Sequence, residues 1–92
     1  MVIIYKDKET RIPYLLDSEK EQLSKDLQIL SVLGAEGIYV NYEKMYVSAY
    51  NYKYGTVGEI IGQSARLIAE IMQRLENKST NYDIENFMRK YL

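Results

Sequence analysis

The sequence lacks cysteine and histidine, and these two absences remove several kinds of chemistry. Without cysteine the chain has no disulfide, no thiolate nucleophile and no zinc-thiolate site, which fits a reducing compartment. Without histidine it lacks the usual general base near neutral pH and the commonest ligand of transition metals. The sequence therefore gives no candidate for a catalytic residue, a metal ligand or a cofactor site.

Long apolar runs and an excess of charge of one sign are also missing. No apolar run approaches the roughly 20 residues that span a bilayer, and the N-terminus becomes charged too early for a signal peptide. We therefore expect a soluble, intracellular, cytoplasmic protein. The 12 basic and 13 acidic residues give a net charge of −1, so no overall field attracts nucleic acid or an anionic membrane.

Tyrosine, by contrast, is abundant, and six of the ten tyrosines lie between residues 39 and 54. Side chains of this stretch alternate between apolar and mostly tyrosine, which is the period of a β-strand. A turn centred on Glu43-Lys44 would make it a hairpin, although Glu-Lys lacks the Asn-Gly chemistry that a tight turn favours. The hairpin register pairs Asn41 with Tyr46, Val40 with Val47, Tyr39 with Ser48 and Ile38 with Ala49.

Residues that face each other across paired strands lie on the same side of the sheet, so this register predicts two different faces. The core side is predicted to hold Ile38, Val40, Tyr42, Met45, Val47 and Ala49. The other side is predicted to hold Tyr39, Asn41, Tyr46, Ser48, Tyr50 and Tyr52.

A first hairpin is predicted for residues 2–16, with Pro13 placing its second strand at an edge because proline cannot donate a ladder hydrogen bond. Ser18 and Glu21 have the spacing of a capping box, which predicts a helix over residues 19–33 that ends at Gly34. Its apolar stripe consists of Leu23, Leu27, Ile29, Leu30 and Leu33.

Thr56 and Glu59 form a second apparent capping box, which predicts a helix over residues 57–76. Its apolar stripe is broad enough to contact two surfaces, and Gly62 inside it suggests close approach of another backbone. Thr80 and Asp83, spaced as Thr80-x-x-Asp83, can then cap a short amphipathic C-terminal helix.

These 92 residues are long enough for one domain, residues 1–92, with a thin core. The predicted fold is α+β, with a small antiparallel sheet of about four strands, two main helices and a short C-terminal helix, in the order ββαββαα.

The partner-binding candidates are the residues on the tyrosine side of the hairpin, namely Tyr39, Asn41, Tyr46, Ser48, Tyr50 and Tyr52. Tyrosine is enriched at protein interfaces, including those between identical chains. Two alternatives remain open: the tyrosines are structural, exposed or covered by the C-terminal helix, or they stack on single-stranded nucleic acid or a nucleotide. The scarcity of basic residues around them disfavours nucleic acid.

The C-terminal helix is predicted to dock either on its own domain or on a second copy, because so short a helix is marginal alone. Its apolar residues, Ile84, Phe87, Met88 and Tyr91, are the candidates for an oligomer contact in a homodimer.

The segment from Lys53 to Gly62 is a glycine-bearing entry to a predicted helix, but its spacing matches no phosphate-binding fingerprint, and helix capping explains it better. The carboxylates show no metal-loop spacing and no partner for acid–base work, so a hydrolase is a remote alternative.

The composition is rich in Ile, Lys, Glu and Tyr, and it resembles that of small accessory proteins of phages, archaeal viruses and thermophiles. That resemblance implies a protein that works by binding. The sequence thus predicts a small non-enzymatic interaction or regulatory protein, homodimeric, with a protein partner whose identity the residues do not indicate.

Overall fold

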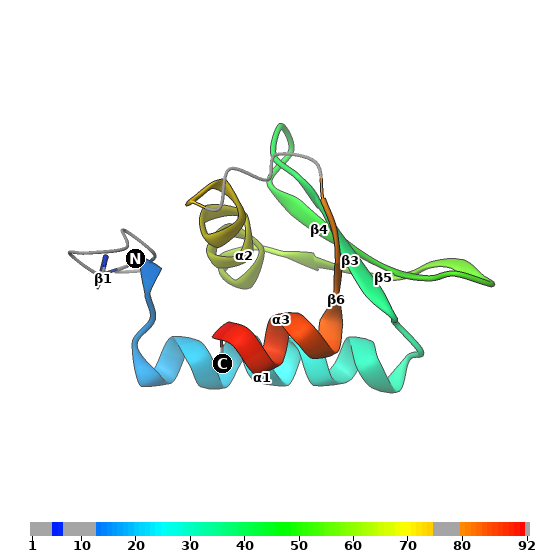
Figure 1. The fold of residues 1–92 in the computed structure, drawn as a ribbon, viewed down its shortest axis with the longest axis horizontal. Coiled ribbons are helices and arrows are strands. Elements are labelled where there is room, and N and C mark those ends of the chain that lie inside the picture. The colour runs from blue at the N-terminus through cyan, green and yellow to red at the C-terminus, as the bar shows by residue number, and fades with distance from the viewer. Residues whose placement is uncertain (1–4, 7–12, 75–79, 92) are drawn as a thin grey trace.

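The computed structural model describes residues 5–6, 13–74 and 80–91 of the chain. Figure 1 shows a single four-stranded sheet with helices packed against it. The elements, in chain order, are β1 (Tyr5–Lys6), β2 (Pro13–Tyr14), α1 (Asp17–Val32), β3 (Gly37–Asn41), β4 (Tyr46–Asn51), β5 (Gly55–Ile61), α2 (Gln63–Arg74), β6 (Asn81–Asp83) and α3 (Ile84–Tyr91). The predicted α+β class is confirmed, and the predicted elements follow in the predicted order with two further strands, β5 and β6, between them.

The central hairpin has the predicted register. Strands β3 and β4 are antiparallel, and Asn41, Val40, Tyr39 and Ile38 face their four predicted partners on β4. Alternation on both strands fixes this register, because a slip by one residue would turn the apolar side chains toward solvent. Ile38, Val40, Val47 and Ala49 are all buried, as predicted for the core side.

The turn of this hairpin differs from the prediction at Met45. Residues 42–45 form a four-residue turn in which Asn41 Oδ1 accepts a hydrogen bond of 2.9 Å from the backbone N–H of Lys44. Met45 has a φ of 54° and is 38% exposed, so it does not lie in the core. Tyr42 packs partly buried against the core, as predicted, and burial raises the pKa of its hydroxyl.

The other strands of the main sheet come from segments that the sequence did not mark as strands. The sheet order is β5-β4-β3-β6, whereas β1 and β2 pair separately in a two-stranded sheet. Residues 57–61 belong to β5 and not to a helix, because β4 offers an unpaired edge and Val57, Ile60 and Ile61 are β-branched. Gly62, with a φ of 90°, ends the strand, and α2 begins directly after it.

Helix α1 begins two residues before the predicted start. Leu16 is its N-cap, and the Leu16 N–H donates a hydrogen bond of 3.0 Å to Glu19 Oε1, so Glu19 takes the capping position that the sequence assigned to Glu21. Gly34 follows the helix with a φ of 93°, as predicted for its end. Leu23, Leu27 and Leu30 are buried, but Ile29 and Leu33 are exposed, so only part of the predicted stripe faces the core.

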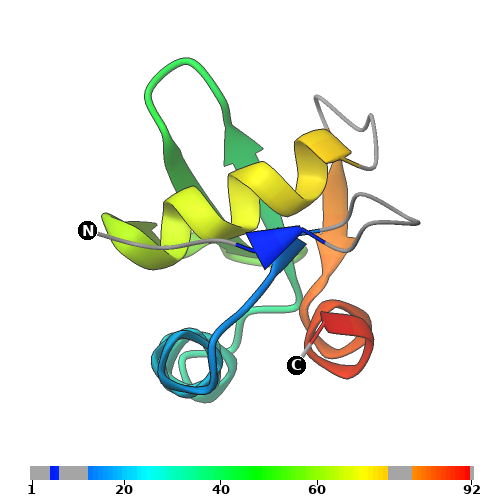
Figure 2. The same cartoon turned by 90° about the vertical axis from the view of Figure 1, so that its left-hand side faces the viewer.

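Helix α2 lies across the inner face of the sheet, and α1 and α3 lie side by side below it (Figure 2). The apolar residues of α2 itself are buried between the sheet and the other helices, as predicted for this part of the stripe. The stripe's predicted first residues, Val57, Ile60 and Ile61, lie on β5 instead. Its predicted last residues, 75 and 76, lie outside the described residues, as does most of the predicted first hairpin.

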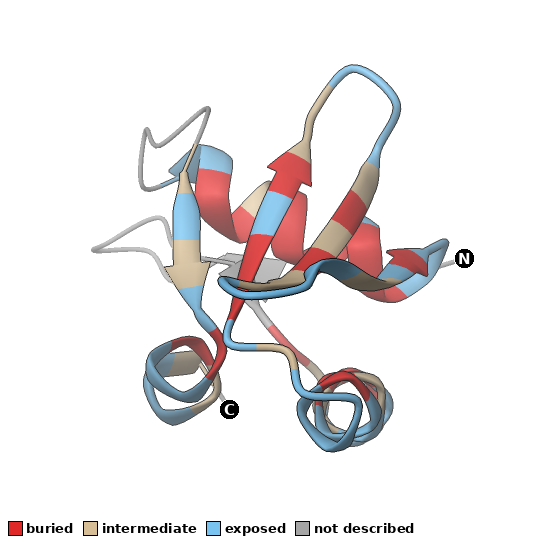
Figure 3. Ribbon diagram, turned by 90° about the vertical axis from the view of Figure 1, so that its right-hand side faces the viewer, coloured by how far each residue is buried: buried red, intermediate tan, exposed pale blue. Residues whose placement is uncertain are grey.

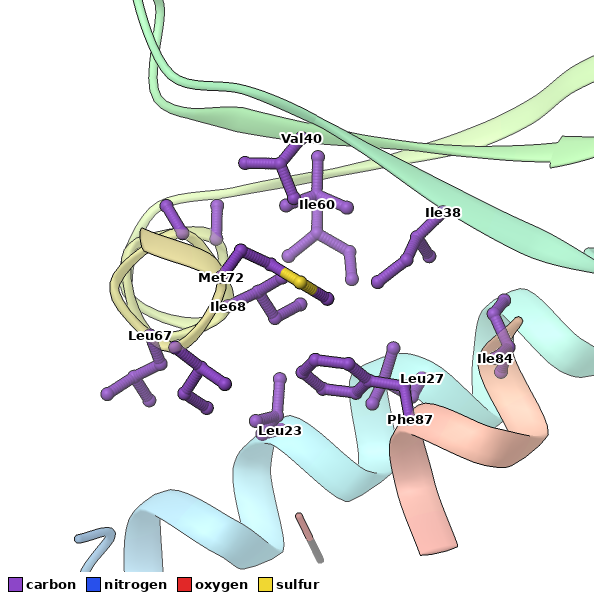
Figure 4. Packing of buried hydrophobic residues seen from close by; sticks show 14 of the residues in the cluster. Leu23, Leu27, Ile38, Val40, Ile60, Leu67, Ile68, Met72, Ile84 and Phe87 are labelled. Atoms are coloured by element: carbon purple, nitrogen blue, oxygen red, sulfur yellow. The ribbon is translucent and has the colours of Figure 1, made fainter. Parts of the chain in front are cut away.

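Helix α3 docks on its own chain, which is one of the two locations that the sequence left open. Asp83 is its N-cap, accepting a hydrogen bond of 2.9 Å from the Asn86 N–H, and Thr80 is not. Phe87 points toward Met72 of α2 with Leu23 and Leu27 of α1 around it (Figure 4). Ile84 and Phe87 are buried, and Met88 and Tyr91 pack partly buried against the same core.

Candidate functional site

The outer face of the four-stranded sheet is the first candidate site. The three helices of the described residues lie on the inner side, so in Figure 3 none of them stands in front of the sheet. The strand registers place on this face Asn81 and Asp83 from β6, Tyr39 and Asn41 from β3, Tyr46, Ser48 and Tyr50 from β4, and Glu59 and Ile61 from β5. We call this set of residues the tyrosine face.

Two rows of side chains cross this face. In the first, Tyr39 is directly opposed to Asn81 on one side and to Ser48 on the other, and Ser48 is opposed to Glu59. In the second, Tyr46 lies between Asn41 and Ile61.

Tyr50 is fixed against its neighbours. It is opposed to Gly37 of β3, and a Cβ at Gly37 would lie 2.6 Å from the Tyr50 hydroxyl oxygen, so the ring covers the glycine. Its ring meets that of Tyr52 edge to face, with 5.5 Å between centroids. Burial, Tyr52 and then Asp83 raise the pKa of the Tyr50 hydroxyl to about 12. Tyr50 is therefore a neutral hydrogen-bonding group at physiological pH.

Five of the six predicted partner-binding residues lie on the tyrosine face, whereas the sixth, Tyr52, lies in the β4–β5 loop beyond the end of β4. These residues are not equally accessible. Tyr39 is 40% and Tyr52 is 78% exposed, whereas Tyr46, Ser48 and Tyr50 are half-buried by their neighbours. The side-chain oxygen of Asn41 is engaged in the β3–β4 turn.

The sequence missed the contributions of β5 and β6 to this face. Glu59, Ile61, Asn81 and Asp83 reach it only because their strands flank the hairpin. The sequence signal for β5 is weak: Thr56, Val57, Ile60 and Ile61 are β-branched, which favours a strand without excluding a helix.

The β4–β5 loop is held by hydrogen bonds to the end of α1. Asn51 Nδ2 donates to the Gly34 carbonyl oxygen over 2.8 Å and to Glu36 Oε1 over 3.2 Å. Asn51 Oδ1 accepts from the backbone N–H groups of Lys53 and Tyr54. Asn51 therefore shapes this loop, and its side chain is occupied within the chain.

A second candidate is the hollow between α1 and β5, which we call the α1–β5 groove. It has a volume of about 260 Å³ and is lined by Asp26, Ile29, Leu30, Glu59, Ile60 and Ile61. A more open apolar depression of about 460 Å³ adjoins it on α1, lined by Lys25, Gln28, Ile29, Val32 and Leu33. The sequence had assigned Ile29 and Leu33 to the core, so it gave no indication of this surface.

Two carboxylates, Asp26 and Glu59, line the groove. Asp26 Oδ2 accepts a hydrogen bond from the buried Ser64 hydroxyl, and Asp26 Oδ1 accepts one of 3.1 Å from Gln22 Nε2. Asp26 therefore links α1 to the first turn of α2 through the hydrogen bond with Ser64, so its carboxylate has a structural role. Across the part of the chain that the structure describes, no three acidic side chains cluster in a way that could hold a metal ion.

None of the helices in the described ranges is long and apolar enough to cross a lipid bilayer. Comparison of the chain with models of protein families, with curated proteins and with solved structures found no significant match.

Proposed function

We propose that this protein is a non-enzymatic interaction module that binds a partner protein through the tyrosine face. The observation that carries this proposal is the placement of every helix on the inner side of the sheet, which leaves the tyrosines of β3 and β4 uncovered. A tyrosine ring provides contact area, and its hydroxyl provides a hydrogen bond, so a group of exposed tyrosines suits protein recognition.

The tyrosine side chains are held in fixed positions, and this supports recognition because rigid groups lose little conformational entropy when they bind. Tyr50 is held by Gly37 and Tyr52, and Tyr46 is half-buried between residues of the adjacent strands. The centre of the tyrosine face is therefore arranged before any partner arrives.

The charges of the face indicate what the partner carries. Glu59 lies on β5 and Asp83 on β6, the two edges of the sheet, so carboxylates flank the tyrosines on both sides. The lysines nearest to this surface, Lys44 and Lys53, lie in the two hairpin loops. This pattern favours a partner with arginine or lysine among apolar side chains, which can contact both a carboxylate and a ring face. It opposes the phosphates of nucleic acid.

The C-terminal helix is not part of this proposal. Ile84 and Phe87 are only 2% and 0% exposed in a single copy, so a partner could reach them only by displacing α3 from its own core.

The test uses a random peptide library displayed on phage and selected against the immobilised protein. We expect the selected peptides to combine arginine or lysine with apolar residues, and to shift the backbone amide signals of β3 and β4 in NMR spectra. Tyr39→Thr, which keeps strand propensity, should weaken a selected peptide at least tenfold. Tyr54→Thr is the matched control, because Tyr54 is 73% exposed but lies in the β4–β5 loop.

The proposal fails if the selected peptides bind equally well to the Tyr39 variant, or if their amide shifts lie elsewhere. A single-stranded oligonucleotide that binds more tightly than any peptide, with strong weakening by salt, would replace it with the nucleic-acid alternative.

A further inference from the structure

The α1–β5 groove and the free edge of β5 form a second interaction surface, which shares only Glu59 and Ile61 with the tyrosine face. We propose that a second copy of this chain docks there, pairing its own β5 antiparallel to β5 and packing its own α1 against α1. This inference goes beyond the proposed function, because it assigns a different surface and a different partner.

The apolar side of this surface is unusually exposed. Val32 is 87%, Ile61 is 74%, Ile29 is 59% and Leu33 is 56% exposed, and all four are large aliphatic side chains. They are contiguous, because Ile29 lines both hollows, with Ile61 in one and with Val32 and Leu33 in the other. Together they present on the order of 400 Å² of apolar surface, a size at which patches are often functional.

The polar side of this surface is the unpaired edge of β5. This strand has seven residues, ends the order β5-β4-β3-β6, and has no strand on its other side within the described residues. Glu59 is its only charged residue and it contains no proline, so the usual protections of an edge strand are weak. Side chains from both faces of β5, Ile60 and Ile61, line the groove, so the groove runs along this edge.

The exposed apolar residues and the free edge of β5 together favour a second copy of the chain as the partner. A single extended peptide added to β5 would lie about 4.8 Å from it and could fill the groove, but it would leave Val32 uncovered, because Val32 does not line that groove. A twofold axis at the edge of β5 pairs strand with strand and places α1 opposite α1, so both halves are covered at once.

The available area agrees with this arrangement. Two facing apolar patches bury about 800 Å², and the paired strands and the polar rim bring the total toward the ~1,200–2,000 Å² of stable interfaces. The rim carries Lys25, which pairs with Glu21 on its own helix, together with Asp26 and Glu59. Asp26 accepts hydrogen bonds from Ser64 and Gln22 within the chain, so Glu59 is the carboxylate of the rim whose charge the two copies must accommodate.

Sedimentation equilibrium across roughly 1–100 μM protein tests the proposal. The full chain should show a monomer–dimer equilibrium, and Val32→Glu should raise the dissociation constant at least tenfold. Val32 is almost fully exposed, so this variant should keep the wild-type far-UV spectrum and melting temperature. Tyr54→Glu introduces the same charge at an exposed aromatic residue outside the surface and should leave the dimer unchanged.

Cross-linking locates the contact independently. The chain has no cysteine, so Val32→Cys introduces a single thiol close to the proposed axis, and mild oxidation should convert most of this variant to a covalent dimer. Glu85→Cys, on the exposed side of α3, should remain largely monomeric under the same conditions.

A chain that is monomeric over the whole concentration range would overturn the proposal, even if a peptide binds in the groove. So would a dimer that survives Val32→Glu and is lost in the Tyr39→Thr variant, because that dimer would use the tyrosine face. The peptide selection tests the tyrosine face whether or not the chain forms a dimer. The proposed function and the proposed dimer can therefore fail separately.

Discussion

Gly58 sets the distance between β5 and α1, and replacing it with alanine tests that packing. A Cβ at Gly58 would lie 2.7 Å from Leu30 Cδ2, well inside van der Waals contact, and 3.8 Å from Leu33 Cδ1. Leu30 is only 4% exposed, so its side chain cannot move into solvent without leaving the core. The φ of Gly58 is not positive, so the added methyl group would cause a steric clash without backbone strain.

Two opposing effects set the magnitude for Gly58→Ala. Overpacking by one methyl group in a filled core costs about 1–3 kcal/mol. The smaller conformational entropy of alanine in the unfolded chain returns about 0.4–1 kcal/mol. We therefore expect a net loss of about 0.5–2 kcal/mol in the free energy of unfolding, measured by urea denaturation followed by circular dichroism.

A double-mutant cycle with Leu30→Ala separates the clash from other causes. Leu30→Ala alone should cost about 2–5 kcal/mol, but in its presence the Gly58→Ala methyl group has room and should stabilise the protein by the entropic contribution of about 0.4–1 kcal/mol alone. The interaction energy should therefore equal the clash, about 1–3 kcal/mol. Leu33→Ala is the control, because its 3.8 Å distance is an ordinary contact. Additivity within about 0.5 kcal/mol, or a Gly58→Ala variant as stable as the wild type, would refute the reasoning.

Two further predictions concern the β3–β4 hairpin. Met45→Asn should raise the free energy of unfolding by about 0.5–1 kcal/mol, because asparagine tolerates the left-handed φ of 54° better than methionine, whereas Met45→Ala should give no such gain. The Tyr50 hydroxyl should titrate at about 12 in NMR spectra of the tyrosine rings, while its ordinary value is 10.0. Because the raised pKa favours the neutral form in the folded state, its contribution to stability is complete below about pH 10 and is lost as the pH rises toward 12. Asp83→Asn should lower the pKa of Tyr50, and a common titration of all tyrosines near 10 would contradict this account.

The hairpin and the C-terminal helix could be predicted from sequence because in each case one local pattern has one structural reading. The alternation from Ile38 to Ala49 fits a strand on both sides of the turn, and only one register buries both sets of apolar residues. Ile84 and Phe87 repeat with a helical period and are buried. The tyrosine face followed from this register without any knowledge of the other strands.

Strand β5 could not be predicted because its apolar residues fit two readings. Val57 and Ile61 are four residues apart and continue the period of α2, so the helix appeared to begin at residue 57. A strand forms here because β4 has a free edge and because Gly62 adopts a left-handed φ. Both features depend on the tertiary structure and cannot be read from the local sequence. β6 has only three residues, too few for a pattern.

The exposure of Ile29 and Leu33 was hidden for a different reason. The apolar residues of a helix indicate its buried side, but they do not show how wide that side is. Helix α1 contacts α2, α3 and β5 through a narrow face, so Ile29 and Leu33 remain exposed. The excess apolar residues of the stripe mark a surface that the single chain leaves uncovered.

Strand β5 contributes to both proposed surfaces, and this links them geometrically. Its outward side chains, Glu59 and Ile61, belong to the tyrosine face and also line the α1–β5 groove, together with Ile60. A second copy paired through the free edge of β5 continues the sheet across a twofold axis perpendicular to it, so the two tyrosine faces lie on the same side. A partner with two binding segments can then engage both faces, and its apparent affinity rises through effective concentration without any new contact. A larger residue at position 58 should affect this arrangement as well as stability, because its Cβ would meet Leu30 and Leu33 of the segment that lines the proposed dimer surface.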